Sequence, residues 1–263
     1  MNLSQLWAYR ELIYFLTWRD VKVRYKQALL GVGWAILQPI LHMVIFTIIF
    51  AKLAGLKPDA GIDPDLYPIF SFAALLPWQL FQGALQRSSI SLVTNANLLT
   101  KIYFPRLIIP FSAVAAGLVD FGFSFLVLVG LMLFYGVALS WNMLWLPLLM
   151  LLALLAALAV GLWLAALNVQ YRDVQHMVPF LIQAWMYASP VAYSLDLIPA
   201  DGPWRVLYAL NPMVGVIQGF RWALLGAAPP SQIMWVSVAM VVILLVSGLY
   251  YFRSMERTFA DTV

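Results

Sequence analysis

Three glutamines could bind hydroxyl groups from within an apolar stretch of the chain. Gln79, Gln82 and Gln86 stand at positions i, i+3 and i+7, so a helix would carry them on one face. Because an amide is costly to place in lipid, this face is expected to point at protein or water. There the amides could exchange hydrogen bonds with a hydroxylated ligand such as a sugar, or they could join neighbouring helices. Both interpretations stay open.

Two ionisable residues, Asp120 and His42, fall inside long apolar stretches. An ionisable side chain within a membrane is by default a hypothesis about function, and Asp120 could carry protons in a coupled carrier. Each residue is alone in its stretch, so a hydrogen-bonded structural role explains it equally well.

Catalytic and metal-binding chemistry finds little support in the sequence. The chain has no cysteine and two histidines, His42 and His176, which leaves no thiolate metal site and no serine–histidine–acid arrangement. The phosphate-binding pattern Gly-x4-Gly-Lys-Ser/Thr is absent, so no cofactor is expected in this chain, and a partner would have to bind any ATP and magnesium. We predict no catalytic residue and no metal ligand.

Several aromatic side chains lie inside or near the polar faces. Flat aromatic rings can stack on the apolar faces of sugar rings, although packing in a core is their commoner role. Together with the three glutamines, these aromatic residues are the candidates for lining a substrate path: Trp34, Trp78, Phe81, Trp185 and Tyr187.

The elements that hold these residues must lie in a membrane. Of the 263 residues, 64% are hydrophobic and 10% are charged, and the mean hydropathy is +0.90. A soluble domain has about 25% charged residues, so a soluble enzyme or binding domain is excluded. We predict an all-α integral membrane protein with room for about six to eight spans of ~20 residues.

Six apolar stretches are long enough to be the spans. They cover residues 30–55, 69–92, 107–135, 143–169, 177–195 and 232–252. Residues 204–225 are also apolar, but Asn211-Pro212 interrupts them, because proline disfavours helix in the residue before it. Each half is too short to cross the bilayer, so we predict two short helices there that enter the membrane and return.

The first segment, residues 1–27, differs from the membrane domain predicted over residues 28–263. It is rich in charge, and its apolar residues recur at helical spacing, which predicts an amphipathic helix lying at the cytoplasmic membrane surface. A helix packed on a partner protein explains the pattern equally well. The apolar residues are Leu3, Leu6, Trp7, Ile13, Tyr14 and Trp18.

Basic residues fix the predicted orientation. With six spans, all but four of the 15 basic residues fall on the side of the two termini, and the four others are Lys52, Lys57, Arg205 and Arg221. The positive-inside rule then places both termini in the cytoplasm of a multi-pass protein of the cytoplasmic (inner) membrane. The positive charge is therefore a signal of topology and does not indicate nucleic acid.

Two predicted cytoplasmic connections are candidates for docking a partner ATPase. The first, NLLTKIYFPR, runs from Asn97 to Arg106 and also offers Lys101 and Tyr103. The second, LNVQYRDV, places the aromatic Tyr171 beside the charged pair Arg172 and Asp173. Taken alone, each connection could be an ordinary solvated turn.

An ordered set of segments resembles a known family. The chain is similar nearly end to end to the membrane subunits of ABC-2 type exporters for polysaccharides and polyol phosphates, which export O-antigen, capsule and teichoic acid. The segments that carry the resemblance are Arg19–Ile40, LPWQLF at Leu76–Phe81, NLLTKIYFPRLIIP at Asn97–Pro110, LNVQYRDV at Leu167–Val174, SPVAYSL at Ser189–Leu195, LNPM at Leu210–Met213 and ERTFAD at Glu256–Asp261.

The resemblance implies six transmembrane helices and a homodimer that works with two copies of a separate ATPase. The interface helix and the cytoplasmic connections would contact that ATPase, and a channel at the dimer centre would conduct a lipid-linked polysaccharide among the membrane lipids. The short helices of 204–225 would form an outer gate, with the candidate residues Tyr208, Asn211, Pro212, Phe220 and Arg221.

Other functions remain as alternatives. The first is a permease of an ABC-2 drug or lipid exporter, and the second is a proton-coupled secondary carrier that uses Asp120. A membrane-embedded glycosyltransferase or phosphotransferase comes third, because the predicted cytoplasmic loops offer almost no acidic residue to act as a base.

Overall fold

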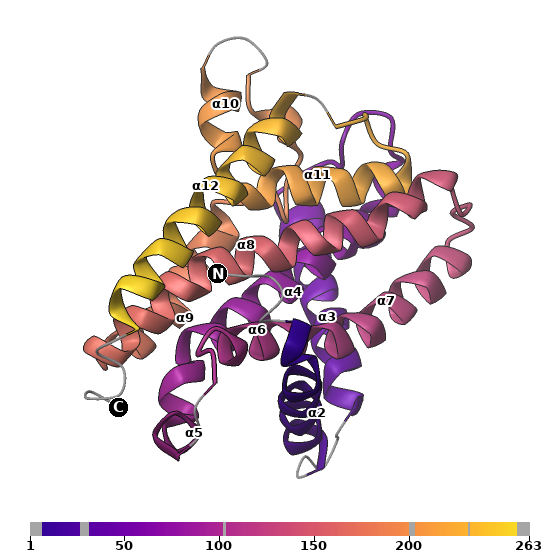
Figure 1. Ribbon diagram of the computed structural model, residues 1–263. Helices are drawn as coiled ribbons and strands as arrows, with labels where there is room; N and C mark the ends of the chain where they lie inside the picture. The colour runs from indigo at the N-terminus through magenta and orange to yellow at the C-terminus, as the bar shows by residue number, and fades with distance from the viewer. Residues whose placement is uncertain (1–6, 27–31, 102–103, 200–202, 231, 257–263) are drawn as a thin grey trace.

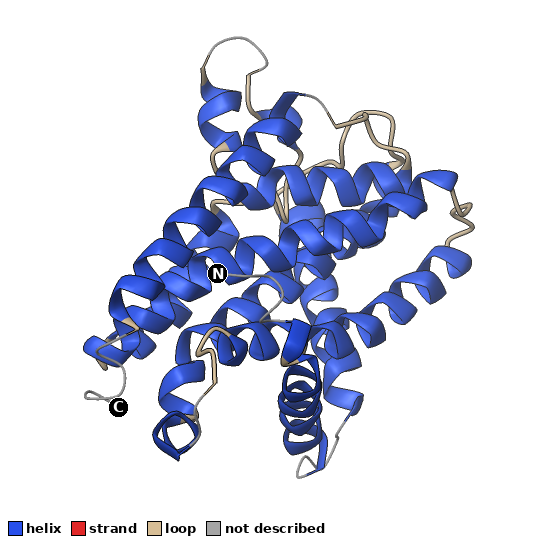
Figure 2. Ribbon diagram, in the orientation of Figure 1, coloured by secondary structure: helices blue, strands red, loops and turns tan. Residues whose placement is uncertain are grey.

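A computed structural model describes residues 7–26, 32–101, 104–199, 203–230 and 232–256. All regular structure in these ranges is helical (Figure 2). The main helices are α2 (Arg10–Lys26), α3 (Val32–Phe46), α4 (Tyr67–Thr94), α5 (Ala96–Lys101), α6 (Ile108–Ala115), α7 (Gly117–Phe134), α8 (Leu146–Gln170), α9 (Val174–Tyr187), α10 (Trp204–Ala209), α11 (Pro212–Leu225) and α12 (Gln232–Met255). A π-helical segment, Thr47–Leu53, continues α3, and short 3-10 turns cover Pro64–Leu66, Trp141–Trp145 and Leu195–Leu197.

Four helical stretches are long and apolar enough to cross a membrane. They are Gly33–Leu53, Ile108–Phe134, Trp141–Gln170 and Gln232–Met255. Their bounds lie within a few residues of four predicted spans. The all-α, membrane-spanning class predicted from composition is therefore confirmed for the described part of the chain.

The predicted span 69–92 corresponds to α4, which is long enough to cross at 28 residues but too polar to count among these four. Its position explains its composition, because α4 packs against α3, α6, α7, α8, α9 and α11 (Figure 1). Helices on most sides of α4 shield it from lipid. A helix shielded in this way can carry serines and glutamines that a lipid-facing helix could not.

The predicted span 177–195 is wrong at its C-terminal end. Helix α9 stops at Tyr187 after 14 residues, which is about 21 Å at 1.5 Å per residue. The chain then turns at Ser189-Pro190, where the Ser189 hydroxyl donates to the Trp185 carbonyl over 2.9 Å. Because proline cannot donate a backbone hydrogen bond, the segment after it leaves the helix and packs as a buried coil.

The N-terminal helix α2 has apolar residues on two faces. Leu16 and Val21 are buried, and α2 packs against α6, where the Thr17 hydroxyl approaches the Ser112 carbonyl at 3.4 Å. The aromatic side chains of Tyr14 and Trp18 instead point outward and are 70% and 46% exposed. The predicted apolar stripe is thus divided between the protein and its surroundings, and Leu3 and Leu6 lie outside the described residues.

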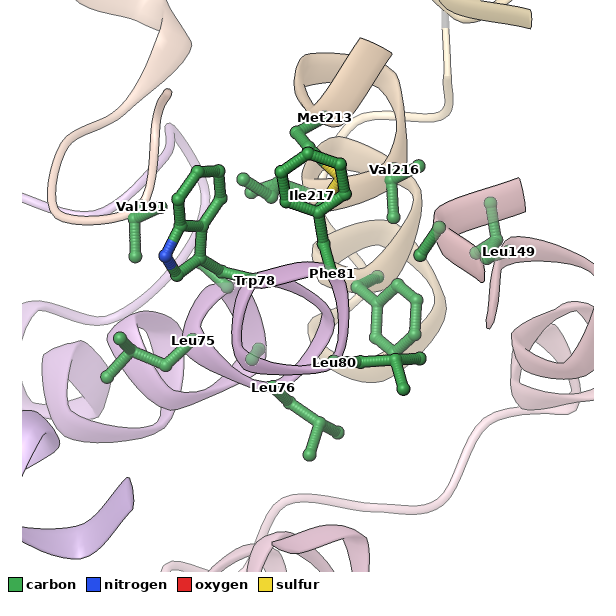
Figure 3. Packing of buried hydrophobic residues seen from close by; sticks show 14 of the residues in the cluster. Leu75, Leu76, Trp78, Leu80, Phe81, Leu149, Val191, Met213, Val216 and Ile217 are labelled. Atoms are coloured by element: carbon green, nitrogen blue, oxygen red, sulfur yellow. The ribbon is translucent and has the colours of Figure 1, made fainter. Parts of the chain in front are cut away.

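The core is built around α4. Figure 3 looks along this helix and shows Trp78 and Phe81 pointing toward Met213 and Ile217 of α11, whereas Leu76 points to the opposite side. All five side chains are at most 1% exposed. Burying aromatic rings of this size removes a large apolar area from the surroundings, which fixes α11 against α4.

Small residues bring α8 close to its neighbours. A Cβ atom added at Gly161 would lie 2.4 Å from the Ser88 hydroxyl of α4, and one added at Gly248 of α12 would lie 2.6 Å from the Ala159 carbonyl. Between membrane helices, where no water is displaced, such close contact of backbones supplies much of the packing energy. Figure 1 shows α8 and α12 running together toward the lower end of the molecule, where α5 also lies, while α10 lies at the upper end.

Candidate functional site

A polar cavity of about 430 Å³ lies among α2, α3, α4 and α7. Its walls hold charged groups near the C-terminal end of α2 and amides along α4. Trp34, Gln38 and Gln86 are exposed and form its mouth. The polar lining residues are Arg24, Tyr25, Gln38, Gln79, Gln82, Gln86, Arg87, Asp120 and Ser124.

Asp120 lines this cavity and is held there by three donors from two other helices. Arg24 and Tyr25 of α2 both donate hydrogen bonds to its carboxylate, and Nη1 of Arg87 in α4 lies 3.4 Å from Oδ2. Asp120 is alone among acidic residues in α7, as the sequence indicates. The fold supplies its partners from positions 33 to 96 residues away.

The guanidinium of Arg87 occupies a slot between two glycines. A Cβ added at Gly117 would lie 2.4 Å from Nη2 of Arg87, and one added at Gly83 would lie 3.0 Å from Nη1. The Nε of Arg87 donates to the Ala113 carbonyl over 3.2 Å. Because neither glycine has a side chain, there is space between them for Arg87 to reach Asp120.

The phenol of Tyr25 keeps its proton in this site. Burial, followed by the hydrogen bond to Asp120, raises the pKa of Tyr25 to about 12. A neutral phenol donates its O–H, so Tyr25 remains a donor to the carboxylate throughout the physiological pH range.

The three predicted glutamines all line the cavity. Oε1 of Gln82 accepts a hydrogen bond of 3.0 Å from the indole of Trp78, and Nε2 of Gln79 is buried without a hydrogen-bond partner. Gln82 thus holds the Trp78 indole on α4, whereas Gln79 keeps an amide donor that no described residue accepts from. Whether this face borders a substrate path stays a prediction.

The structure separates the predicted lining aromatics into two groups. Trp34 is 53% exposed at the mouth of the cavity, and Tyr187 is 58% exposed near the end of α9. Trp78 and Phe81, by contrast, are fully buried, so these two expose no surface to a ligand in this conformation. The α11 side chains around them are apolar, so these two rings pack in the core and do not face the cavity. Trp185 is half-buried and meets Phe81 edge-on at a centroid distance of 5.1 Å.

The predicted break at Asn211-Pro212 is confirmed, since it divides residues 204–225 into α10 and α11. Oδ1 of Asn211 caps α11 by accepting from the Met213 amide over 3.0 Å. Pro212 takes the first helical position, where its missing N–H is no loss. Tyr208 of α10 shares a hydrogen bond with Tyr193, which ties α10 to the coil after α9.

Arg221 lies in the interior, although it was predicted among residues of an outer gate. It is 0% exposed, and its guanidinium lies 3.6 Å from the centroid of the Phe70 ring. It donates to the carbonyls of Val191 and Tyr193 over 3.1 and 3.2 Å. Asp59 is 3.9 Å away. A buried charge needs partners of this kind, so Arg221 joins α11 to the coil after α9 and to the loop before α4.

Phe220 beside it is also fully buried and meets Phe121 of α7 edge-on at 6.3 Å. Neither Phe220 nor Arg221 therefore presents a surface that could close against a substrate in this conformation. Tyr208 and Asn211 are partly accessible.

The two predicted docking connections differ in accessibility. Asn97 and Lys101 are exposed on or beside α5. Arg106 is half-buried, and its guanidinium donates to the Glu256 carbonyl. Tyr103 lies outside the described residues. In the second connection, Tyr171, Arg172 and Asp173 are all exposed in the turn between α8 and α9.

Sequence reasoning missed the basic half of the cavity. Arg87 follows Gln79 by eight positions and Gly83 by four, so it continues the polar face of α4, and this spacing could have revealed it. No comparable signal marks Arg24 or Tyr25, because only the packing of α2 against α6 brings them to α7. Among the described residues, no group of acidic or histidine side chains could hold a metal ion.

Comparison with known proteins gives relatives that match nearly the whole chain. The O-antigen export system permease protein RfbA of Myxococcus xanthus is 31% identical over 260 residues, which is 98% of each chain. The Klebsiella pneumoniae protein of the same name is 29% identical over 252 residues, or 95% of this chain and 94% of the relative. The polysialic acid transport protein KpsM of Escherichia coli is 26% identical over 245 residues, or 91% of each.

These matches confirm the resemblance stated from the ordered segments. The pattern of the family described as ABC-2 type transporter covers residues 11–225. That range begins in α2 and ends with α11, so it includes the polar cavity and the buried arginine. The chain therefore belongs to the ABC-2 type transporter family.

Proposed function

We propose that this chain is the membrane-spanning subunit of an ATP-driven exporter that moves a lipid-linked polysaccharide across the cytoplasmic membrane. The observation that carries the proposal is the full-length similarity to proteins named for O-antigen export and polysialic acid transport. The matches cover 91% to 98% of both chains. The substrate is an O-antigen, a capsular polysaccharide or a similar glycan.

The chain crosses the membrane six times in this proposal. The four apolar stretches account for four crossings. Helix α4 makes a fifth in the centre of the bundle, and α9 with the coil that follows it makes the sixth. An even number of crossings leaves both termini in the cytoplasm, in agreement with the distribution of basic residues.

A separate ATPase supplies the energy, since the chain lacks a phosphate-binding loop. Two copies of that partner bind ATP and magnesium, and their closure on ATP changes the conformation of a homodimer of this chain. Exposed Asn97, Lys101, Tyr171, Arg172 and Asp173 offer contacts on the cytoplasmic side, and the outward aromatic face of α2 adds a further contact or lies in the headgroup region.

The polysaccharide passes through a channel at the centre of the homodimer. The lining candidates that remain accessible in one subunit are Trp34, Gln86 and Tyr187, while Gln79, Gln82 and Trp185 are partly buried behind them. Helices α10 and α11 close the outer end. Amides that exchange hydrogen bonds with hydroxyl groups let a polymer slide without tight binding.

The alternatives find less support. Asp120 is bound by Arg24, Tyr25 and Arg87, so a hydrogen-bonded structural role accounts for its place in a span without a proton carrier. A drug or small-lipid exporter remains the second candidate, because it would use the same fold with an ATPase.

Reconstitution tests the proposal. Vesicles that contain this chain and its ATPase receive one of three substrates in their outer leaflet. The substrates are fluorescent lipid-linked O-antigen, a lipid-linked capsular polysaccharide and a small lipophilic dye. We expect ATP-dependent transfer of a glycan across the bilayer and none with an ATPase that lacks its phosphate-loop lysine. Hydrolysis of ATP with transfer of the dye alone would contradict the substrate assignment.

A further inference from the structure

The polar cavity retains unused hydrogen-bond donors around its charged end. A guanidinium carries five N–H donors, yet Arg24 makes one bond and Arg87 two to other described residues. Nε2 of Gln79 is buried with no partner. Because a buried donor is normally satisfied, the Gln79 amide points to a ligand that supplies an acceptor, and the two guanidinium groups hold further N–H donors that no described residue uses.

The balance of charge in the cavity favours an anion. Arg24 and Arg87 contribute two positive charges, and Asp120 contributes one negative charge. The three side chains are between 25% and 32% exposed, so they are partly withdrawn from water while the cavity stays open to a ligand. Guanidinium groups match phosphate oxygens in geometry and charge.

The remaining lining is suited to hydroxyl groups. From Gln79 to Arg87 the polar face of α4 covers nine residues, a length of about 12 Å along the helix axis. The amides occupy this length and Arg87 ends it, and Trp34 lines the same cavity from α3. A volume near 430 Å³ is within the usual range for pockets that bind small molecules.

We propose that Arg24 and Arg87 form a subsite for a phosphate group carried on a lipid anchor, and that Asp120 occupies both arginines while the site is empty. The glycan unit next to that phosphate then lies along Gln82 and Gln79. This inference rests on the proposed function, because it assigns the cavity to the phosphate-bearing end of the lipid-linked glycan.

The Asp120 carboxylate makes the site switchable. When the phosphate binds, the Arg87 guanidinium leaves the Asp120 carboxylate and donates to the phosphate oxygens. The ion pair between α4 and α7 is then replaced by an ion pair between α4 and the substrate. Tyr25 still donates to the carboxylate, which keeps Asp120 satisfied when the arginines leave. Substrate binding at this end therefore removes the guanidinium links to Asp120 and leaves Tyr25 to connect α2 with α7 through that carboxylate.

Binding measurements on the complex of this chain with its ATPase, in phosphatidylcholine nanodiscs, test the proposal. The probes are decaprenyl diphosphate, decaprenol and inorganic diphosphate, and the bound fraction is read by native mass spectrometry. We expect decaprenyl diphosphate to bind and Arg87→Gln and Arg24→Gln each to weaken that binding by roughly tenfold or more. Asp120→Asn is expected to strengthen it, because the competing carboxylate is gone.

Two variants separate binding from mere stability. Gly117→Ala keeps every charge but places a methyl group where Nη2 of Arg87 lies, so it is expected to weaken binding as Arg87→Gln does. Arg205→Gln, far along the chain beside Asp196, serves as the control and leaves binding unchanged. A purely structural cluster predicts the opposite for Asp120→Asn, namely a lower thermal midpoint with no gain in affinity.

The outcomes are distinguishable. Equal binding of decaprenol and decaprenyl diphosphate, or unchanged affinity in both arginine variants, overturns the subsite. Inorganic diphosphate that binds as tightly as the lipid, with the same dependence on Arg24 and Arg87, supports the anion site and assigns it to a free phosphate. Retained phosphate binding in vesicles that export no glycan would refute the proposed function and leave the subsite in place.

Discussion

Trp185 and Asn211 are joined by a hydrogen bond of 2.9 Å from the indole nitrogen to Oδ1. The same amide donates to the Ser189 hydroxyl over 2.9 Å and to the Ala188 carbonyl over 3.1 Å, and Oδ1 also accepts from the Met213 amide. One asparagine therefore fixes three things together: the end of α9, the turn after it and the start of α11.

Asn211→Ala should destabilise the outer end of the protein. It removes the cap of α11 and leaves the Trp185 indole without its acceptor, which costs about 1–3 kcal/mol. The readout is thermal unfolding of the purified protein in detergent. Asn211→Asp keeps the acceptor but loses both amide donors, so its midpoint is expected between those of the alanine variant and the parent. Equal midpoints for all three would contradict this role.

Arg221 and Asp59 should be energetically coupled. Arg221→Met removes a buried cation and leaves Asp59, whose side chain is 9% exposed, as an uncompensated anion, with an expected loss of about 3–5 kcal/mol. The double variant Asp59→Asn with Arg221→Met should recover part of that loss. A double-mutant cycle of unfolding free energies measures the coupling, and strictly additive effects would show that the pair does not interact.

Gly248→Ala should separate α12 from α8. The added methyl group meets the Ala159 carbonyl at 2.6 Å, which is backbone and cannot rotate away, so overpacking of about 1–3 kcal/mol is expected. The matched control is Gly130→Ala in α7, where an added Cβ would meet no atom within 4 Å apart from the backbone of its own helix turns. The thermal unfolding midpoint of the protein in detergent should fall for Gly248→Ala and stay unchanged or rise for Gly130→Ala. A fall of the same size in both would point to helix backbone effects instead of packing.

Charge reversal in the α8–α9 turn should uncouple the ATPase. Tyr171 is 57% exposed and Arg172 is exposed beside it, so Arg172→Glu is expected to leave the free energy of unfolding within about 0.5 kcal/mol of the parent. ATP hydrolysis by the reconstituted complex should lose its response to glycan, or the ATPase should fail to copurify. Lys57→Glu, exposed in the loop before α4, is the control. Parent-like coupling in Arg172→Glu would remove this turn from the docking surface.

The absence of cysteine allows a direct test of orientation. Lys57→Cys and Arg172→Cys each introduce one thiol at an exposed position in a chain that has none. In intact cells, a membrane-impermeant maleimide should label the first variant and not the second, because the predicted topology places position 57 outside and position 172 in the cytoplasm. Labelling of both in intact cells would refute the three crossings predicted between positions 57 and 172.

The sequence determined the class of the protein, most span bounds and the break at Asn211-Pro212. These are local properties: a run of apolar residues has few alternatives to a membrane helix, and Asn211-Pro212 joins a helix-capping residue to a residue suited to the first helical position. The polar face of Gln79, Gln82 and Gln86 could also be found in this way, because helical spacing alone puts the three amides on one side.

The tertiary structure decided which polar and aromatic residues meet. Asp120 finds Arg24 and Arg87, Asn211 finds Trp185, and Arg221 is enclosed beneath Phe70. Trp78 and Phe81 differ little in type from Trp34, yet two are buried and one is exposed. Such partners lie far apart in the chain, and their contact depends on how α2, α7 and α11 pack around α4. Packing is a property of the whole set of helices, which no single segment encodes.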